Sequence, residues 1–188
     1  ARLKIIKTKS GPEATARRLR YHAVKSVALE NSYSKIATAH NLNDQAETVL
    51  LNILRSTGDE GLFGIPPLRE VKDSPPGKKL IIIRPLLGIL RAEIYGYIRE
   101  NHLAYRTDTS NYNTRFSRNL IRLKVIPMIE KINPAVNSHL SNIAEWAEEA
   151  RKCLDVQTAG ILSRISGKLK NGIYLDLSRF LGYNYSIY

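Results

Sequence analysis

The stretch that decides the fold of this 188-residue chain runs from Ala39 to Thr57 and reads A-H-N-L-N-D-Q-A-E-T-V-L-L-N-I-L-R-S-T. The apolar residues immediately before it predict a short buried strand. Within it, apolar residues recur at the i, i+3, i+4, i+7 and i+8 spacing of one helical face. A strand that runs into a helix is typical of an open α/β sheet, whose ligands bind where strands end and helices begin. The apolar helix residues are Ala46, Val49, Leu50, Ile53 and Leu54.

Three polar residues stand at this predicted junction. His40 follows the strand, and Asp44 and Glu47 are three positions apart, so they share one face of the first helical turn. Each has a common structural explanation: the two acids fit a variant of the capping box, and His40 fits an ordinary histidine at the end of a strand. Their combination at a ligand-binding edge favours a charged functional site. The residues alone leave both interpretations open.

A second apolar run, Leu80–Arg84, predicts another strand, and the residues from Arg91 predict the helix after it. Alternation of strands and helices at this spacing is typical of a parallel α/β sheet. We expect this strand to lie parallel and close to the one at residues 35–39, with the Asp44 helix packed on the sheet. The chain is mostly helical from Lys124 onward. We therefore predict an α/β part over residues 1–112 and a helical region over residues 113–188 that leads into a further domain.

The charge balance favours a polyanionic partner. The chain has 29 Lys and Arg against 17 Asp and Glu, a formal net charge of +12. Arg115, Arg118 and Arg122 fall at i, i+3 and i+7, so one helical face presents three guanidinium groups that suit a nucleic-acid phosphate backbone. The alternative interpretation is a solvated stripe of charge.

The single cysteine, Cys153, rules out an internal disulfide framework and an all-cysteine metal site. Its alanine-rich helical surroundings predict a small core residue. No apolar run approaches the roughly 18 residues of a membrane span, and no signal segment begins the chain. We expect a cytoplasmic protein with no membrane partner.

Several motifs together resemble one known family. The A-H-x-x-x-D-Q-A-E-T pattern at residues 39–48 is followed by glycines at 58, 61 and 64, R-P-L-L begins at Arg84, and residues 108–122 carry D-x-S-N followed by F-x-R-N-x-I-R. Over most of the chain these motifs resemble the tRNA(Ile)-lysidine synthase family of PP-loop ATP pyrophosphatases. Asn41 and Asn43 depart from the family pattern, which has a histidine and an acid there, so no role is carried over to them.

The resemblance implies a PP-loop α/β domain and an ATP-dependent ligase that modifies tRNA. In that family ATP adenylates the wobble cytidine in the CAU anticodon of an isoleucine tRNA, and the ε-amine of free lysine then displaces AMP to give lysidine. A lysine ammonium has a pKa of about 10.4, so it must lose a proton before it attacks. The resemblance implies that Asp44 and Glu47 bind the ammonium and that one of them or His40 accepts the proton.

The same resemblance implies a role for Arg20, which lies in an A-R-x-x-R-Y pattern and would stabilise negative charge on the phosphate. Without the resemblance, Arg20 fits a solvated basic face. ATP and magnesium are the expected cofactors, with tRNA, lysine and ATP as partners. No metal-ligating residue is predicted. The oligomeric state stays open, with a homodimer as one expected arrangement.

The ATP-binding loop of that family, S-G-G-x-D-S, does not occur in these 188 residues. We therefore expect this chain to be a fragment that lacks the loop and is inactive alone. Two alternatives stay open: a PP-loop enzyme that thiolates tRNA, which can carry an iron–sulfur cluster on cysteines, and a helical RNA-binding module without catalysis.

Overall fold

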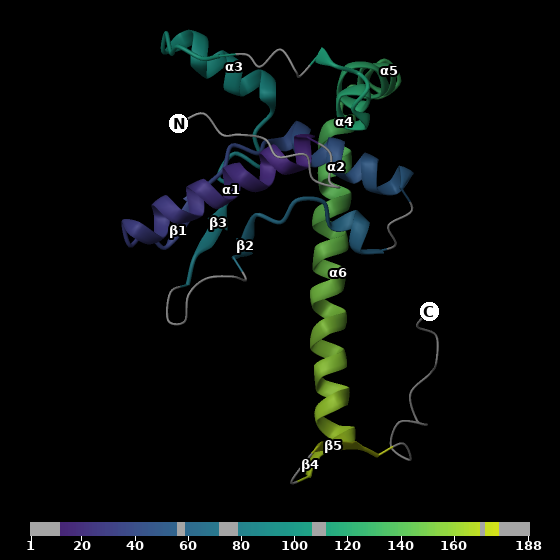
Figure 1. The fold of residues 1–188 in the computed structure, drawn as a ribbon. Helices are drawn as coiled ribbons and strands as arrows, with labels where there is room; N and C mark the ends of the chain where they lie inside the picture. The colour runs from purple at the N-terminus through teal and green to yellow at the C-terminus, as the bar shows by residue number, and fades with distance from the viewer. Residues whose placement is uncertain (1–11, 56–58, 72–78, 107–111, 170–171, 177–188) are drawn as a thin grey trace.

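The computed structural model describes residues 12–55, 59–71, 79–106, 112–169 and 172–176 (Figure 1). The described part combines a small sheet with a larger helical part, which confirms the mixed α/β prediction. The 3-10 helix is η1 and the short π-helix is η3. In chain order the elements are α1 (Pro12–Glu30), β1 (Lys35–Ala37), α2 (Leu42–Leu54), η1 (Asp59–Phe63), β2 (Leu68–Glu70), β3 (Ile81–Ile83), α3 (Arg91–Glu100), α4 (Ser117–Leu120), η3 (Ile121–Val125), α5 (Ile126–Glu130), α6 (Val136–Ile165), β4 (Ser166–Leu169) and β5 (Gly172–Leu175).

A three-stranded sheet in the order β1-β3-β2 forms the α/β part. Strands β1 and β3 are adjacent and parallel, with Lys35 opposite Ile81 and Ala37 opposite Ile83. Strand β2 pairs with β3 in the antiparallel direction. The predicted parallel pairing of the two apolar runs is confirmed. Because β1 and β3 are parallel, both end at the same edge of the sheet, where α2 also begins.

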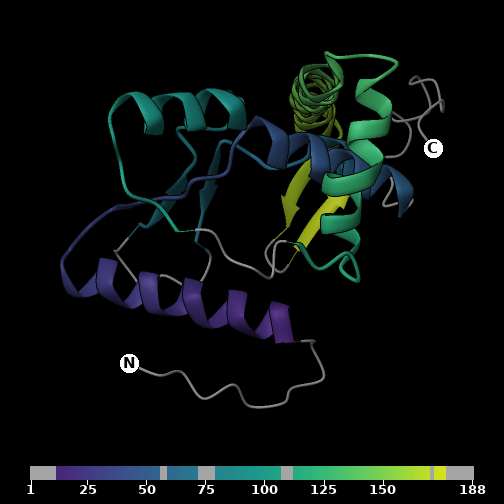
Figure 2. The same ribbon diagram turned by 90° about the horizontal axis from the view of Figure 1, so that it is seen from above.

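Helix α1 covers the sheet and closes the first hydrophobic core. Figure 2 shows α1 along one side of the strands, with α6 seen end-on at the other side. The buried residues of this core are Ala28 from α1, Ile36 from β1, and Leu80 and Ile82 from β3 and the residue before it. Leu80 and Ile82 are fully buried, and each such side chain contributes roughly 1.5–3 kcal/mol to folding.

Helix α2 belongs to a second core, formed with the helices that follow the sheet. The periodicity identified the first part of its apolar face correctly, because Ala46 and Val49 are fully buried and Leu50 packs against the same core. The predicted face was wrong at Ile53 and Leu54, which are exposed. The buried part of this face packs against α6 and the segment from α4 to α5 rather than the sheet, so the predicted packing partner was wrong. Apolar spacing identifies a buried face of a helix but carries no information about the surface that covers it. The partners are Ile121, Ile126, Val136, Leu140 and Ala144.

Helix α6 extends away from both cores and ends in the β4–β5 hairpin (Figure 1). Its 30 residues span about 45 Å at 1.5 Å per residue. No residue between Ala144 and Ile165 is buried. Cys153 lies on this exposed length as a free thiol, so the prediction of a core cysteine was wrong. None of the helices in the described ranges has the length and apolar content that a membrane span needs.

Candidate active site

The first turn of α2 is closed by two reciprocal hydrogen bonds. Asn41 Oδ1 accepts the backbone N–H of Asp44 at 3.1 Å, and Asp44 Oδ2 accepts the backbone N–H of Asn41 at 3.1 Å. The pair forms a capping box. The capping interpretation therefore holds for Asp44, but the partner is Asn41 rather than Glu47. Because only Oδ2 takes part in the cap, Oδ1 of Asp44 is available to other groups.

Glu47 lies on the same helical face as Asp44, and its side chain is 1% exposed. Arg122 binds it twice, with Nε at 2.6 Å from Oε1 and Nη2 at 2.8 Å from Oε2. Arg118 Nε donates to Oε2 at 2.9 Å, and Arg91 Nη2 donates to Oε1 at 3.3 Å. The same three arginines contact Asp44 Oδ1, at 3.1 Å for Arg122, 3.2 Å for Arg91 and 3.4 Å for Arg118. We call these five side chains the carboxylate–arginine cluster.

The hydrogen-bonding capacity of Glu47 is filled in this arrangement. A carboxylate offers roughly four acceptor positions, and Glu47 receives four N–H groups. Burial acts to raise the pKa of Glu47, but the hydrogen bonds and charges of Arg122 and Arg118 outweigh it and lower that pKa. Hydrogen bonding to Glu47 raises the pKa of Arg122. Three guanidinium groups face two carboxylates, so the cluster carries one net positive charge.

The arginines of this cluster reach the carboxylates from two directions. Arg118 lies in α4 and Arg122 in η3, four positions apart and therefore on the same side of the helical segment. Arg91 is the first residue of α3, and its backbone N–H donates to Asn43 Oδ1 at 2.8 Å. Arg91 was not predicted as a site residue. A buried pair of acids needs cations close by, so the R-P-L-L-x-x-x-R pattern was the available signal for it.

The predicted basic face of Arg115, Arg118 and Arg122 is only partly formed. Arg115 precedes α4 and is exposed, and its backbone N–H donates to Asn113 Oδ1 at 3.1 Å. Arg118 and Arg122 instead face Glu47. The three residues therefore do not form one solvated helical stripe, because α4 begins only at Ser117. Their role in tRNA binding stays a prediction.

A cavity of about 520 Å³ brings most of the predicted site residues together. Arg20 reaches it from α1, His40 from the residues after β1, Asp44 from α2, and Arg118 and Arg122 from the helical segment. Glu47 lies behind Arg118 and Arg122, to which it is bonded. The lining also includes Arg17, Tyr21, Val24, Ile36, Ala37, Thr38, Ala39 and Asn119.

His40 is half-buried at the edge of this cavity. Its Nδ1 lies 3.0 Å from the Thr38 hydroxyl oxygen, which orients the ring. Burial lowers the pKa of His40; Asp44 opposes this, while Arg84 and Arg17 add to it. The imidazole is therefore neutral near pH 7, because its pKa lies below the ordinary value of 6.5. A neutral imidazole can accept a proton.

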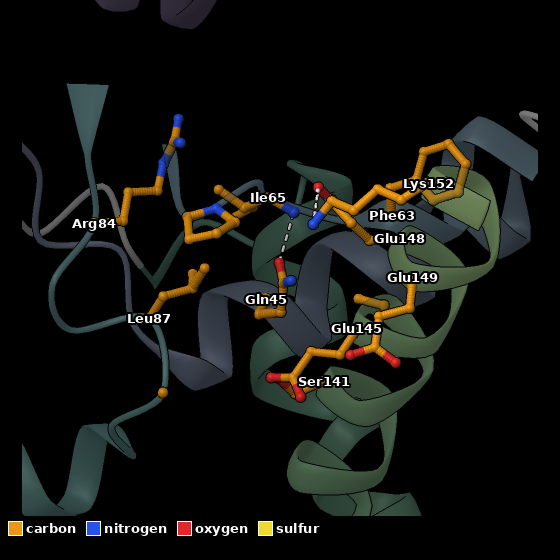
Figure 3. A pocket seen from close by; sticks show the side chains of 13 residues that line it. Gln45, Phe63, Ile65, Arg84, Leu87, Ser141, Glu145, Glu148, Glu149 and Lys152 are labelled. Atoms are coloured by element: carbon orange, nitrogen blue, oxygen red, sulfur yellow. Dashed lines mark hydrogen bonds and ion pairs between the residues drawn. The ribbon is translucent and has the colours of Figure 1, made fainter. Parts of the chain in front are cut away.

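A second cavity of about 420 Å³ lies beside α2, between α6 and the segment around Gly64, which runs from Phe63 to Pro67 (Figure 3). Gln45 from α2 stands in it, and Glu145, Glu148 and Glu149 come from α6. Gln45 Oε1 accepts the backbone N–H of Ile65 at 2.6 Å, which fastens the segment to α2 (Figure 3). The sequence did not single out Gln45. Its neighbour in the chain, Asp44, turns toward the first cavity.

The first cavity suits phosphate groups better than a metal ion. Its lining holds four arginines, Arg17, Arg20, Arg118 and Arg122, against the single carboxylate of Asp44. Guanidinium groups match phosphate oxygens in charge and geometry. In the part of the chain that the structure describes, no three His, Cys, Asp or Glu side chains are grouped to hold a metal ion. A magnesium ion would therefore depend on phosphate oxygens for most of its ligands.

Comparison with known proteins places this geometry in a family. The profile of the PP-loop domain family matches residues 2–129. The tRNA(Ile)-lysidine synthase of Thermosipho africanus is 37% identical over 167 residues, which cover 87% of this chain and 37% of that protein. The tRNA(Ile)-lysidine synthase of Chlorobaculum tepidum is 37% identical over 183 residues, which cover 92% of this chain and 51% of that protein. The chain thus spans about half the length of these relatives or less.

A solved structure shares the fold. The U34-tRNA thiolase NcsA from Methanococcus maripaludis, solved with its 4Fe–4S cluster, matches with a TM-score of 0.57 and 21% identity, over 77% of this chain and 46% of that one. At this identity the likeness concerns the fold alone. For the present chain, the parallel strands, the family profile and the relatives agree. The chain belongs to the PP-loop domain family, and the relatives it matches include tRNA(Ile)-lysidine synthases.

Proposed function

We propose that this chain is part of a tRNA(Ile)-lysidine synthase, which uses ATP to join lysine to the wobble cytidine of an isoleucine tRNA. The observation that carries the proposal is the grouping of Arg20, His40 and Asp44 around one cavity, with Glu47 behind it. The relatives bear the same name. The proposal extends to the substrates ATP, free lysine and a tRNA with a CAU anticodon.

The cationic lining of the cavity supports the first step, in which ATP adenylates the cytidine. Arg17 and Arg20 from α1 line the cavity together with Arg118 and Arg122. These groups bind and orient phosphate oxygens, and they stabilise negative charge that develops when the cytidine oxygen attacks the α-phosphorus of ATP and pyrophosphate leaves. Magnesium supplies further positive charge when it accompanies ATP. The residues of this chain would contact it chiefly through the bound phosphates.

Binding of lysine in the second step requires a change in the carboxylate–arginine cluster. Asp44 and Glu47 are the only acids of the cluster, and every acceptor of Glu47 is already taken by a guanidinium N–H. An incoming ammonium must therefore displace an arginine. Arg91 makes a single contact to Glu47, at 3.3 Å, which is longer than the contacts of Arg118 and Arg122. We infer that lysine takes the place of Arg91.

His40 is the better candidate for the proton acceptor. Its neutral imidazole faces the cavity, whereas Glu47 has a lowered pKa and its oxygens are occupied. A neutral imidazole can accept a proton, whereas a carboxylate held by guanidinium groups is a weaker base. Asp44 and Glu47 then hold the ammonium, and His40 takes its proton before the amine attacks the adenylated cytidine. AMP leaves with the electrons of the broken carbon–oxygen bond.

The test separates the two chemical steps in the full-length protein. Asp44→Asn and Glu47→Gln should raise the apparent KM for lysine or abolish lysine transfer, while AMP transfer from ATP to tRNA survives. Asp155→Asn, at an exposed acid on α6, serves as the matched control. Arg91→Gln should lower the KM for lysine, because a competing cation is removed.

The contrary result is equally clear. If both steps fall in proportion to the loss of folded protein, Asp44 and Glu47 only hold the fold and the arginines. In that case the chain is better described as an RNA-binding module whose acids position Arg118 and Arg122.

A further inference from the structure

Helix α3 buries none of its ten residues. It lies apart from α1 in both views of the fold (Figure 1, Figure 2). Its beginning is fastened to α2, because the backbone N–H of Arg91 donates to Asn43 Oδ1 at 2.8 Å. A helix of this length gains most of its stability in water from packing one face against a partner. The exposed length of α3 is therefore a candidate docking surface.

The charges of α3 lie on opposite sides of the helix. Arg91, Tyr95 and Arg99 are spaced by four residues, so they follow one another along one side. Glu93 and Glu100 are two turns apart and lie on the opposite side. Arg99 is exposed and forms no ion pair with any other residue that the structure describes. One side of α3 thus combines positive charge with an aromatic ring.

The turn that ends α3 brings a second tyrosine back to this side. His102 has a left-handed φ of 51°. The backbone N–H of Leu103 donates to the Ile98 carbonyl at 2.9 Å, which is the bond of a Schellman motif that ends the helix and redirects the chain. Tyr105 then lies against Tyr95, with ring centroids 5.6 Å apart and ring planes inclined by 52°.

The two tyrosine rings form an accessible pair. Tyr95 is 41% exposed and Tyr105 is 58% exposed. Tilted aromatic rings attract each other when their centroids are about 4.5–7 Å apart, so each ring helps to hold the other. Because the two rings are in contact, a further planar group would stack on an outer ring face rather than between them.

The tyrosine pair stands close to the candidate active site. Arg91, one helical turn before Tyr95, contacts Asp44 Oδ1 at 3.2 Å, and four residues of helix span about 6 Å. Asp44 and Arg122 both line the 520 Å³ cavity. The hydrogen bond to Glu47 is the main cause of the raised pKa of Arg122, and the Tyr95 phenol adds to it. A polymer bound at the tyrosine pair can therefore present one of its units to the cavity.

We propose that Tyr95, Tyr105 and Arg99 bind an unpaired stretch of RNA beside the cavity. A nucleobase stacks on an outer face of the tyrosine pair, and Arg99 holds a backbone phosphate. Single-stranded loops offer unstacked bases to such aromatic rings. The formal net charge of +12 favours a polyanion at this surface. The inference rests on the proposed function, because it takes the RNA to be the anticodon loop of the tRNA.

RNA binding to the full-length protein, measured without ATP or lysine, tests this. Tyr95→Leu and Tyr105→Leu remove a ring and keep an apolar side chain, whereas Tyr95→Phe keeps the ring. Tyr97→Leu is the matched control, because Tyr97 is 62% exposed on the other side of α3. The probes are a tRNA with a CAU anticodon, its anticodon stem-loop, and a blunt RNA duplex without a loop. The melting temperature of each variant is measured without RNA.

We expect Tyr95→Leu and Tyr105→Leu to weaken binding of the tRNA and the stem-loop about tenfold, because a stacked base is lost. Tyr95→Phe and Tyr97→Leu should bind normally, and affinity for the duplex should stay unchanged in every variant. Arg99→Gln should reduce the slope of log affinity against log salt by about one. Tyr105 lies outside the helices, so its variant decides the test if Tyr95→Leu melts at a lower temperature.

Unchanged affinity of the folded leucine variants for the stem-loop would overturn the inference. An equal loss in Tyr97→Leu, in Tyr95→Phe or toward the blunt duplex would also overturn it, since base stacking on this pair would not explain such a loss. Unchanged RNA affinity in a Tyr105→Leu protein whose dimer dissociates in sedimentation would assign the surface to a second copy of the chain instead. If the leucine variants lose stem-loop binding as expected but the unsubstituted protein forms no lysidine, only the proposed function fails.

Discussion

Arg122 binds Glu47 through two parallel contacts, Nε to Oε1 at 2.6 Å and Nη2 to Oε2 at 2.8 Å. The two residues are 75 positions apart in the chain. This pair joins the N-terminal half of α2 to η3, so it links the end of the sheet to the helical region. Because Glu47 is almost wholly buried, its charge depends on the arginines that surround it.

Removing one partner of this pair should destabilise the protein strongly. Arg122→Met leaves the buried Glu47 with fewer donors, and we expect a loss of about 3–5 kcal/mol in the free energy of unfolding, measured by urea denaturation. Lys152→Met, which removes an exposed partner of Glu148 on α6, is the control and should change stability by less than about 1 kcal/mol. Equal losses of stability in the two variants would contradict a stabilising role for the buried Arg122–Glu47 pair.

Gly64 should tolerate no side chain. Its φ is +59°, and a Cβ there would lie 2.6 Å from Gln45 Oε1. Gly64→Ala should therefore lower stability by about 1–3 kcal/mol, as judged by thermal or urea unfolding. Gly160→Ala in α6, where no atom lies within 4 Å of the added Cβ, should instead raise stability by roughly 0.5–1 kcal/mol. A neutral Gly64→Ala would mean that the Gln45–Ile65 hydrogen bond does not fix this segment.

Acid should destabilise the protein in two steps. The pKa of His40 lies below its ordinary 6.5 and that of Glu47 below its ordinary 4.5. Both groups therefore bind fewer protons in the folded protein than in the unfolded chain, so stability falls as the pH drops. The contribution of His40 is lost below about pH 6.5 and that of Glu47 below about pH 4.5.

Urea unfolding across this range checks the assignment. His40→Asn should flatten the dependence just below about pH 6.5, and Glu47→Gln should flatten it just below about pH 4.5. His139, exposed on α6, provides the control substitution His139→Asn. A steep loss of stability that persists just below about pH 6.5 in the His40 variant would place its origin in another group.

Arg115 should bind tRNA phosphate without serving the fold. It is exposed and lies outside the carboxylate–arginine cluster. Arg115→Gln in the full-length protein should reduce the slope of log affinity against log salt by about one and leave the melting temperature unchanged. Arg118→Gln should lower stability as well, because Arg118 also bonds Glu47. An unaltered salt slope in the Arg115 variant would remove it from the tRNA surface.

The sequence by itself determined the short-range part of the site. A strand followed by a polar turn and a helix places His40 beside Asp44 and Glu47, because three-residue spacing puts both acids on one face. The apolar runs also predicted parallel strands that end at that face, and the structure has them in register from Lys35–Ile81 to Ala37–Ile83. These features follow from periodicity and from backbone geometry, which act over a few residues.

Only the tertiary structure decided what surrounds the acids. Arg91, Arg118 and Arg122 reach Glu47 from 44 to 75 positions away, and they convert two apparently open carboxylates into an occupied cluster. Packing likewise placed α2 on α6 instead of the sheet and left Arg84 buried without a carboxylate partner among the described residues. Ion pairing and burial depend on which distant segments meet, and that arrangement leaves no periodic signature in the chain.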